Sequence, residues 1–134
     1  MATATNLEAE ARLLLIEDNP VNMRLAVAIL EAAGFQVAQA ADAEEALVLL
    51  EHRVPDLILT DIGLPGMDGL ALTKRLKENG RLRHIPVVAL TAFAMNGDEQ
   101  RALAAGCTGY ITKPIQTHGL VEQIRKFLRQ RDQA

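Results

Sequence analysis

The sequence contains few aromatic residues and little cysteine. Its 134 residues include no tryptophan, one tyrosine and three phenylalanines, so aliphatic side chains must build most of the core. The single cysteine, Cys107, excludes an internal disulfide, and so low a cysteine content is typical of a reducing compartment. We therefore expect a cytoplasmic protein in which Cys107 has a packing role.

Long apolar runs and an excess of positive charge are also missing. No apolar run approaches the ~20 residues that a membrane span needs, and the N-terminal MATATNLEAEAR has no apolar signal core. The formal net charge of −3 argues against a nucleic-acid surface, which would need a basic face. We expect neither a membrane nor a nucleic-acid partner.

The chain has the length of one domain and shows no linker or internal repeat. Polar and small residues at both ends predict a flexible N-terminal segment at 1–11, a folded domain at 12–130 and a flexible tail at 131–134.

Strand-like apolar runs alternate with helical patterns along the folded domain. The predicted strands are Leu13–Ile16, Phe35–Ala40, Leu57–Thr60, Val87–Leu90 and Gly109–Thr112. The first, third and fourth are continuously apolar, which is typical of parallel strands covered on both faces.

Residues that start or end helices lie between these strands. The predicted helices run from Pro20 to just before Gly34, from a capping box of Asp42 and Glu45, from Asp68-Gly69 to near Asn79-Gly80, from Asp98 to Gly106, and from a cap at Thr117. Five strand–helix units with short connections predict right-handed crossovers and one parallel sheet with helices on both faces.

Polar side chains stand where four of the predicted strands end. Glu17 and Asp18 follow the first strand, Asp61 the third, Thr91 the fourth and Lys113 the fifth. The carboxyl ends of parallel strands share one edge of a sheet, where ligands usually bind. We therefore expect these five groups to converge.

Three carboxylates, an ammonium and a hydroxyl make chemical sense together. A Mg²⁺ ion would neutralise the acids, while the lysine and the hydroxyl suit phosphoryl oxygens. A central carboxylate can act as a nucleophile and form an acyl phosphate. Considered one at a time, these residues could also have ordinary structural roles. Glu17 and Asp18 could start a helix, Asp61 could cap a loop, Thr91 could bond to the backbone at a strand end, and Lys113 could be a surface lysine.

Four motifs carry a resemblance to a known family. They are IEDN at 16–19, LTDIGLPGMDG at 59–69, ALTA at 89–92 and YITKP at 110–114. In this order and spacing the chain resembles the receiver domains of two-component response regulators. The resemblance implies a flavodoxin-like (βα)5 three-layer sandwich with a five-stranded parallel sheet in the order 2-1-3-4-5.

The resemblance also implies residue roles. Asp61 would be the phosphoacceptor, and Glu17, Asp18, Asp61 and the backbone carbonyl of Gly63 would hold Mg²⁺. The phosphate-binding and switch residues would be Thr91, Ala92, Tyr110 and Lys113, with a cis peptide bond between Lys113 and Pro114. Gly63 and Phe93 would set the lifetime of the phosphoryl group. Tyr110 fits a half-buried core position as well as a switch.

The implied function is bacterial phosphorelay signalling. A sensor histidine kinase or a histidine phosphotransfer protein would donate the phosphoryl group. The face formed by the fourth helix, fifth strand and fifth helix would then bind a downstream protein. Residues 91–115 are similar to those of single-domain regulators, so we expect such a regulator, as a monomer or weak dimer. The alternative is a receiver module excised from a hybrid histidine kinase, acting as a phosphorelay intermediate.

The first helix allows two interpretations. Leu25, Ala28, Ile29 and Ala32 form a predicted core stripe, and Met23, Val27 and Leu30 widen the apolar arc. This arc is explained either by burial against the last helix or by a partner surface. The resemblance places a partner near the acidic pair, with Asn22, Met23 and Ile115 as the docking residues.

Enzyme classes built on similar sheets fit less well. A haloacid-dehalogenase-type phosphatase would need an aspartate at position 63, where this chain has glycine, and a flavodoxin would need a hydroxyl-rich loop in place of Glu17 and Asp18. The sequence also lacks the GxxxxGK[ST] nucleotide loop. We expect a phosphoacceptor switch that assists its own phosphorylation and dephosphorylation, and not an enzyme.

Overall fold

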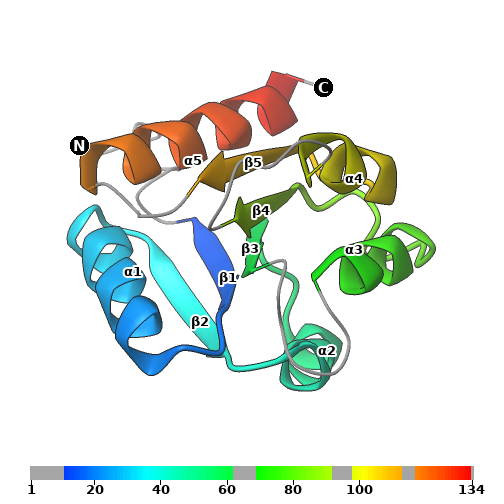
Figure 1. Ribbon diagram of the computed structural model, residues 1–134, viewed down its shortest axis with the longest axis horizontal. Helices are drawn as coiled ribbons and strands as arrows, with labels where there is room; N and C mark the ends of the chain where they lie inside the picture. The colour runs from blue at the N-terminus through cyan, green and yellow to red at the C-terminus, as the bar shows by residue number, and fades with distance from the viewer. Residues whose placement is uncertain (1–10, 62–68, 92–97, 113–116, 134) are drawn as a thin grey trace.

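The computed structural model describes residues 11–61, 69–91, 98–112 and 117–133. Strands and helices alternate along them (Figure 1). The strands are β1 (Arg12–Ile16), β2 (Gln36–Ala40), β3 (Leu57–Asp61), β4 (Val87–Thr91) and β5 (Gly109–Thr112). The helices are α1 (Pro20–Ala32), α2 (Ala43–His52), α3 (Gly69–Lys77), α4 (Asp98–Ala105) and α5 (Thr117–Gln133).

The strands form one parallel sheet in the order β2-β1-β3-β4-β5. β1 lies between β2 and β3, and its Leu14 pairs with Ala38 on one side and with Ile58 on the other. The three continuously apolar strands β1, β3 and β4 are the interior strands of this sheet. Helices cover both faces of such strands, so the side chains on both faces are apolar. The expected strand order and sheet type are confirmed.

Helices cover both faces of the sheet (Figure 1). Leu13 and Leu15 of β1 belong to a core cluster shared with α1 and α5, whereas Leu14 and Ile16 belong to a second cluster shared with α2, α3 and α4. Successive strand residues point to opposite faces, so one five-residue strand supplies both cores. This arrangement is the flavodoxin-like three-layer sandwich.

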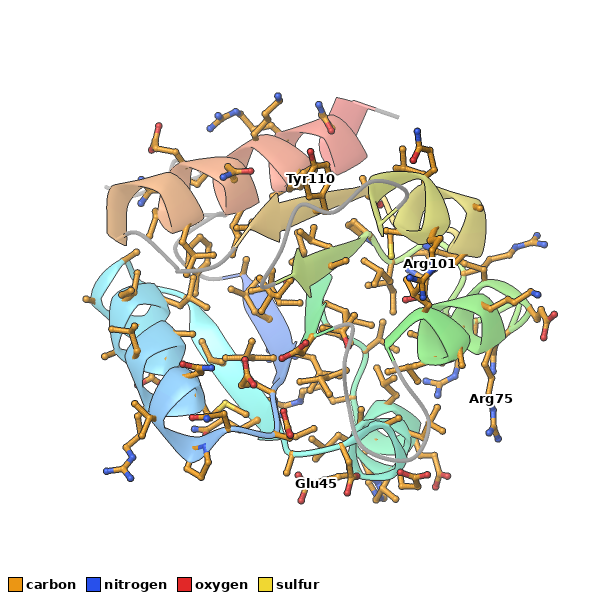
Figure 2. All side chains as sticks on the ribbon, in the orientation of Figure 1. Glu45, Arg75, Arg101 and Tyr110 are labelled. Carbon is orange, nitrogen blue, oxygen red and sulfur yellow. The ribbon has the colours of Figure 1, made fainter. Side chains whose placement is uncertain are left out.

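The starts of α1 and α2 follow from their capping residues. Asn19 Oδ1 accepts hydrogen bonds from the backbone N–H groups of Val21 (2.9 Å) and Asn22 (3.0 Å), one residue before Pro20 opens α1. At α2, Asp42 Oδ1 accepts a hydrogen bond from the N–H of Glu45 (2.8 Å). Figure 2 labels Glu45. These side chains satisfy N–H groups that have no partner within the helix. The predicted starts of both helices are therefore confirmed.

The buried face of α1 differs from the predicted stripe. The buried residues of α1 are Met23, Ala26, Ile29 and Leu30. Of the expected stripe only Ile29 is buried, while Leu25 is 49% exposed and Ala28 and Ala32 are exposed. Apolar residues surround most of this helix, so their periodicity alone could not identify the side that packs on the sheet.

Two helix boundaries also differ from expectation. α3 ends at Lys77, two residues before Asn79, because the Asn79 N–H turns back to the carbonyl of Leu76 (3.1 Å) in a tighter turn. α5 includes Thr117 as its first residue, and residues 131–133 of the expected tail are helical. None of the helices in these described stretches is long and apolar enough to cross a membrane.

The end of α3 is attached to its neighbours through Lys77. Its ammonium donates hydrogen bonds to the carbonyls of Arg83 (3.0 Å) and Ile85 (2.7 Å), and burial lowers its pKa. Gly106, with φ of 107°, leaves room for the lysine stem, since a Cβ there would lie 2.7 Å from Lys77 Cγ. Cys107 is buried, its Sγ lies 3.7 Å from Thr73 Oγ1, and burial raises its thiol pKa, which fits the predicted packing role.

Replacing Lys77 with methionine tests this anchor. The substitution keeps an unbranched apolar stem but removes the donor for two carbonyls, so we expect the free energy of unfolding to fall by about 1 kcal/mol. Urea denaturation measures the change. Lys74→Met, on an exposed position of the same helix, is the matched control and should stay within ~0.5 kcal/mol of wild type. Equal effects of the two substitutions would contradict the anchoring role.

Candidate functional site

Three carboxylates meet at the C-terminal end of the sheet. Glu17 and Asp18 follow β1, and Asp61 is the last residue of β3, the strand beside β1. Ile16 pairs with Thr60, so the residue after each of them lies at the same level of the sheet. One carboxylate oxygen from each acid lies within 4.8 Å of the other two. The convergence of these three acids, expected from their positions at strand ends, is therefore observed.

The three acids differ in their access to water. Glu17 is 3% exposed, Asp61 is half-buried and Asp18 is exposed. The backbone fixes Glu17, because its N–H donates to the carbonyl of Ala40 (3.0 Å) and its Oε2 accepts from the N–H of Asn19 (3.2 Å). The cluster therefore has a rigid buried side and a side open to a ligand.

The three negative charges of this cluster would be stabilised by a bound cation. Two unit negative charges at such a separation repel each other by about 3 kcal/mol at the effective dielectric constant near a protein surface. A nearby positive charge would turn this repulsion into attraction. The donor set consists of hard carboxylate oxygens with one side open to water, which fits Mg²⁺, an ion that takes few carboxylates and keeps several waters.

The start of α3 approaches the Asp61 backbone closely. A Cβ on Gly69 would collide with the carbonyl oxygen of Asp61 and would lie 3.0 Å from Thr60 Oγ1. The Thr60 hydroxyl donates to that same carbonyl (3.2 Å), and the Thr73 hydroxyl donates to the carbonyl of Gly69 (2.8 Å). Glycine is therefore required at position 69 by a close approach of two backbones.

Tyr110 and Thr91 lie on the two strands beyond Asp61. Tyr110 extends from β5 (Figure 2), pairs with Ala89 of β4, and packs half-buried against the core cluster of α2, α3 and α4. For Thr91 the structure describes the backbone, which ends β4 one residue beyond Leu90, the partner of Asp61. The remaining predicted site residues lie outside the described residues; they are Gly63, Ala92, Phe93, Lys113, Pro114 and Ile115.

Burial corrects one of the expected docking residues, Met23, whereas the docking roles of Asn22 and Ile115 stay predictions. Met23 is only 9% exposed and belongs to the core cluster of α1 and α5, so its side chain is not available to a partner, and Asn22 is half-buried. Val21 and Leu25, which were not predicted to belong to this surface, are 68% and 49% exposed. Their spacing of four residues directly after the acidic pair was the signal that could have identified them.

The parallel α/β sheet and the acidic cluster at its C-terminal end place the protein in the class of α/β proteins that bind ligands at this edge of the sheet. A comparison with protein-family models identifies the particular family. The model described as "Response regulator receiver domain" matches residues 13–125, most of the chain. The chain belongs to this family and is a receiver domain of two-component signalling.

Individual relatives agree with this assignment. The chain is 47% identical over 115 residues to the polar-differentiation response regulator DivK of Brucella anthropi. The matched residues cover 86% of this chain and 94% of that relative. The receiver domain of a signal transduction histidine kinase from Syntrophus aciditrophicus is 35% identical, with a TM-score of 0.82 over 89% of this chain and 90% of that one. The receiver domain of sensor histidine kinase PA1611 from Pseudomonas aeruginosa, solved with a magnesium ion in its active site cleft, is 34% identical, with a TM-score of 0.82 over 89% and 98%.

Proposed function

We propose that the protein is a single-domain response regulator that accepts a phosphoryl group on Asp61 from a phosphohistidine of a partner. The observation that carries this proposal is the meeting of Glu17, Asp18 and Asp61 within 4.8 Å at the C-terminal end of the sheet. Membership of the receiver family, a family of phosphoacceptor switches, supports it. The similarity to DivK favours a single-domain regulator.

The transfer forms one bond and breaks another. A carboxylate oxygen of Asp61 attacks the phosphorus, a P–O bond forms, and the P–N bond to the imidazole breaks with its electron pair. The released imidazole nitrogen then binds a proton from water, and the product is an acyl phosphate. Asp61 is half-buried, and its backbone carbonyl accepts from the Thr60 hydroxyl and lies against Gly69, which restricts where its side chain can lie before the attack.

The acidic residues would also hold the cofactor. Glu17, Asp18, Asp61 and the backbone carbonyl of Gly63 are the proposed Mg²⁺ ligands, with Glu17 acting more often through water. When bound, Mg²⁺ supplies positive charge that offsets the charge of the phosphoryl oxygens. The magnesium reported for the PA1611 receiver domain supports this assignment.

Asp18→Asn is expected to raise the stability of the metal-free protein and to reduce the stabilisation that Mg²⁺ gives. In EDTA the variant should unfold at a higher temperature than wild type, because one of three repelling charges is gone, and the gain stays below about 1 kcal/mol since Asp18 is exposed. In millimolar Mg²⁺ wild type should be stabilised more strongly than the variant. Thermal unfolding in both buffers measures this. A variant stabilised by Mg²⁺ as much as wild type would contradict the metal role of Asp18.

Phosphorylation would be reported to other proteins through a switch. We propose that Thr91, the Ala92 backbone and Lys113 bind the phosphoryl oxygens and that Tyr110 changes its packing in response. The half-burial of Tyr110 on β5, next to α4, suits a side chain with two alternative positions. The Lys113-Pro114 bond would be cis, and Gly63 and Phe93 would influence the lifetime of the phosphoryl group. The output surface would be the α4-β5-α5 face.

The phosphodonor is proposed to dock beside the acidic cluster. The exposed apolar side chains of Val21 and Leu25 lie on one face of α1, immediately after Glu17 and Asp18. An apolar patch beside a charged site suits a protein partner, either a sensor histidine kinase or a histidine phosphotransfer protein. Met23, being buried, would support this face from within.

Leu25→Ser separates docking from chemistry. We expect phosphotransfer from a phosphorylated histidine partner to slow about tenfold, because partner contact area is lost, while labelling by acetyl phosphate stays unchanged. Both rates are followed by intact mass. Val48→Ser removes an apolar side chain of similar exposure, 55%, from α2 and serves as the matched control. Equal slowing with both donors would mean that Leu25 acts on the chemistry or the fold.

A second candidate is a receiver module of a hybrid histidine kinase, which would pass its phosphoryl group on to another histidine. Two of the similar solved structures are receiver domains of histidine kinases, and this similarity supports the second candidate. Incubation of the phosphorylated protein with a histidine phosphotransfer protein other than its phosphodonor discriminates the two. Rapid loss of the label to that protein supports the relay, whereas retention supports the single-domain regulator.

The direct test of the proposed function is phosphorylation of the purified chain. A phosphorylated histidine partner or acetyl phosphate is added with Mg²⁺ or with EDTA, and the intact mass is measured. We expect the addition of one phosphoryl group, dependent on Mg²⁺. If a folded protein gains no phosphoryl group from either donor, the phosphoacceptor function is wrong.

A further inference from the structure

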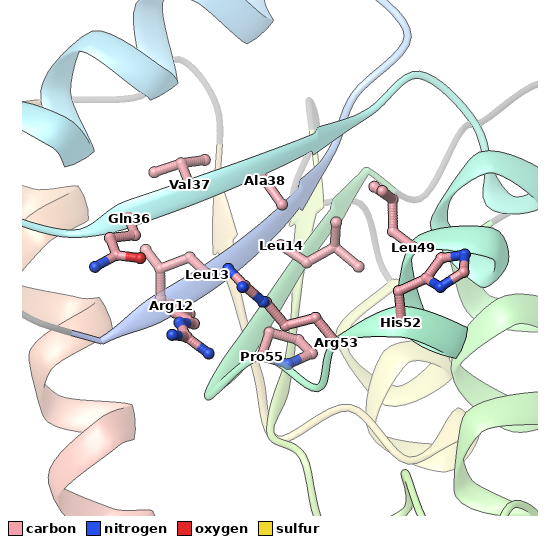
Figure 3. Close-up of a pocket in the computed structure, with 10 residues that line it drawn as sticks. All are labelled: Arg12, Leu13, Leu14, Gln36, Val37, Ala38, Leu49, His52, Arg53 and Pro55. Carbon is pink, nitrogen blue, oxygen red and sulfur yellow. The ribbon is translucent and has the colours of Figure 1, made fainter.

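A hollow of about 490 Å³ lies at the end of β1 away from the acidic cluster (Figure 3). We call it the basic hollow. Arg12, His52 and Arg53 are among its polar lining, and Leu14, Ala38 and Leu49 are among its apolar lining. These residues come from β1, from the edge strand β2 and from the end of α2. The volume falls within the range of ~300 to 1,000 Å³ typical of sites for small organic molecules.

The charge of the basic hollow is opposite to that of the chain. The formal net charge is −3, yet the described residues that line the hollow include two arginines and no acid. In Figure 3 the side chain of Arg53 extends from the end of α2 across β1 towards Arg12. Neither guanidinium has a hydrogen-bond or ion-pair partner among the residues that the structure describes. Two cations that line one hollow attract an anion.

The negative end of α2 offsets only part of this charge. The last carbonyls of a helix carry partial negative charge, but two of them are already engaged here. The carbonyl of Leu49 accepts from the Arg53 N–H (3.1 Å), and the carbonyl of Leu50 accepts from the guanidinium of Arg81 (2.7 Å). The nearby Asp56 accepts a hydrogen bond from the Arg12 N–H (2.8 Å) and is not one of the described lining residues.

We propose that the basic hollow binds a small organic carboxylate. Its head would be held by the planar guanidinium groups of Arg12 and Arg53, whose geometry matches a carboxylate. Its apolar body would lie on Leu14, Ala38 and Leu49. This site is separate from the phosphoacceptor site, so the proposal goes beyond the proposed function and does not depend on it.

Three probes with one body and different heads test the proposal: phenylbutyrate, phenylbutanol and phenylbutylamine. Each is titrated into the full chain and followed by amide NMR. We expect phenylbutyrate to shift the amides around Leu14, Ala38 and Leu49 and to bind at least tenfold more tightly than the alcohol, while the ammonium probe does not bind there. Equal binding of the acid and the alcohol, or shifts spread over other surfaces, would overturn the proposal without any variant.

Variants locate the head group. Arg53→Gln should weaken phenylbutyrate binding about tenfold and leave the weak binding of phenylbutanol unchanged, and Arg12→Gln should behave in the same way. Arg24→Gln removes one charge from an exposed position of α1 and is the matched control, with no expected change. If Arg53→Gln and Arg12→Gln retain wild-type spectra and wild-type affinity, the assignment of the head group is wrong.

Discussion

Asp61→Asn is expected to lower phosphoryl incorporation from acetyl phosphate by at least ~100-fold, because an amide oxygen is a far weaker nucleophile than a carboxylate. The substitution keeps the size and shape of the side chain, so the half-buried position at the end of β3 remains filled. Intact mass after incubation with Mg²⁺ and donor measures the loss.

Two controls show whether the loss of labelling comes from the missing nucleophile. Glu44→Gln removes one negative charge from an exposed position of α2 and should label like wild type. Asp61→Asn should also be more stable than wild type in EDTA, because the repulsion within the acidic cluster is reduced. Undiminished labelling of a folded Asp61→Asn protein would mean that another residue accepts the phosphoryl group.

Gly69→Ala is expected to lower the free energy of unfolding by about 2 kcal/mol and to slow phosphorylation. The new methyl group would collide with the carbonyl of Asp61, so the start of α3 or the end of β3 must move. A displaced Asp61 loses the position from which it attacks the phosphoryl group. Urea denaturation and labelling by acetyl phosphate measure the two effects.

Gly80→Ala is the matched control for this substitution. A Cβ at Gly80 would meet no atom within 4 Å, so its stability should stay within ~0.5 kcal/mol of wild type and its labelling should be unchanged. Alanine is also the better helix former at position 69. A neutral or stabilising Gly69→Ala would therefore show that the close approach of the two backbones is not required.

The fold could be predicted because its signals are local and agree with one another. Continuous apolar runs mark β1, β3 and β4 as interior parallel strands, and Asn19-Pro20 and Asp42 with Glu45 mark helix starts. Each observed strand is within one residue of its predicted bounds at either end. The strand order, in contrast, came from the family resemblance, since periodicity does not say which strands are neighbours.

The meeting of Glu17, Asp18 and Asp61 could be predicted for a related reason. In a parallel sheet the residues that follow the strands share one edge, so positions far apart in sequence are brought together by topology alone. Their difference in burial was not predictable in this way, because it depends on the hydrogen bonds of Glu17 with Ala40 and Asn19.

The features that could not be predicted arise where sequence signals are ambiguous or nonlocal. α1 has apolar residues on most sides, and only packing decides that Met23 is buried while Leu25 is exposed. The requirement for glycine at position 69 arises from a close approach between α3 and β3. The basic hollow likewise joins Arg12 and Arg53, which no sequence motif connects.

The chemical identity of the phosphorylated residue would establish whether Asp61 is the phosphoacceptor. Borohydride reduces an acyl phosphate to the alcohol, so treatment of the phosphorylated protein should convert one aspartate into homoserine, which peptide mass spectrometry locates. We expect homoserine at position 61, formed only when Mg²⁺ was present during phosphorylation. Homoserine at another position, or a phosphoryl group found on a histidine, would contradict it.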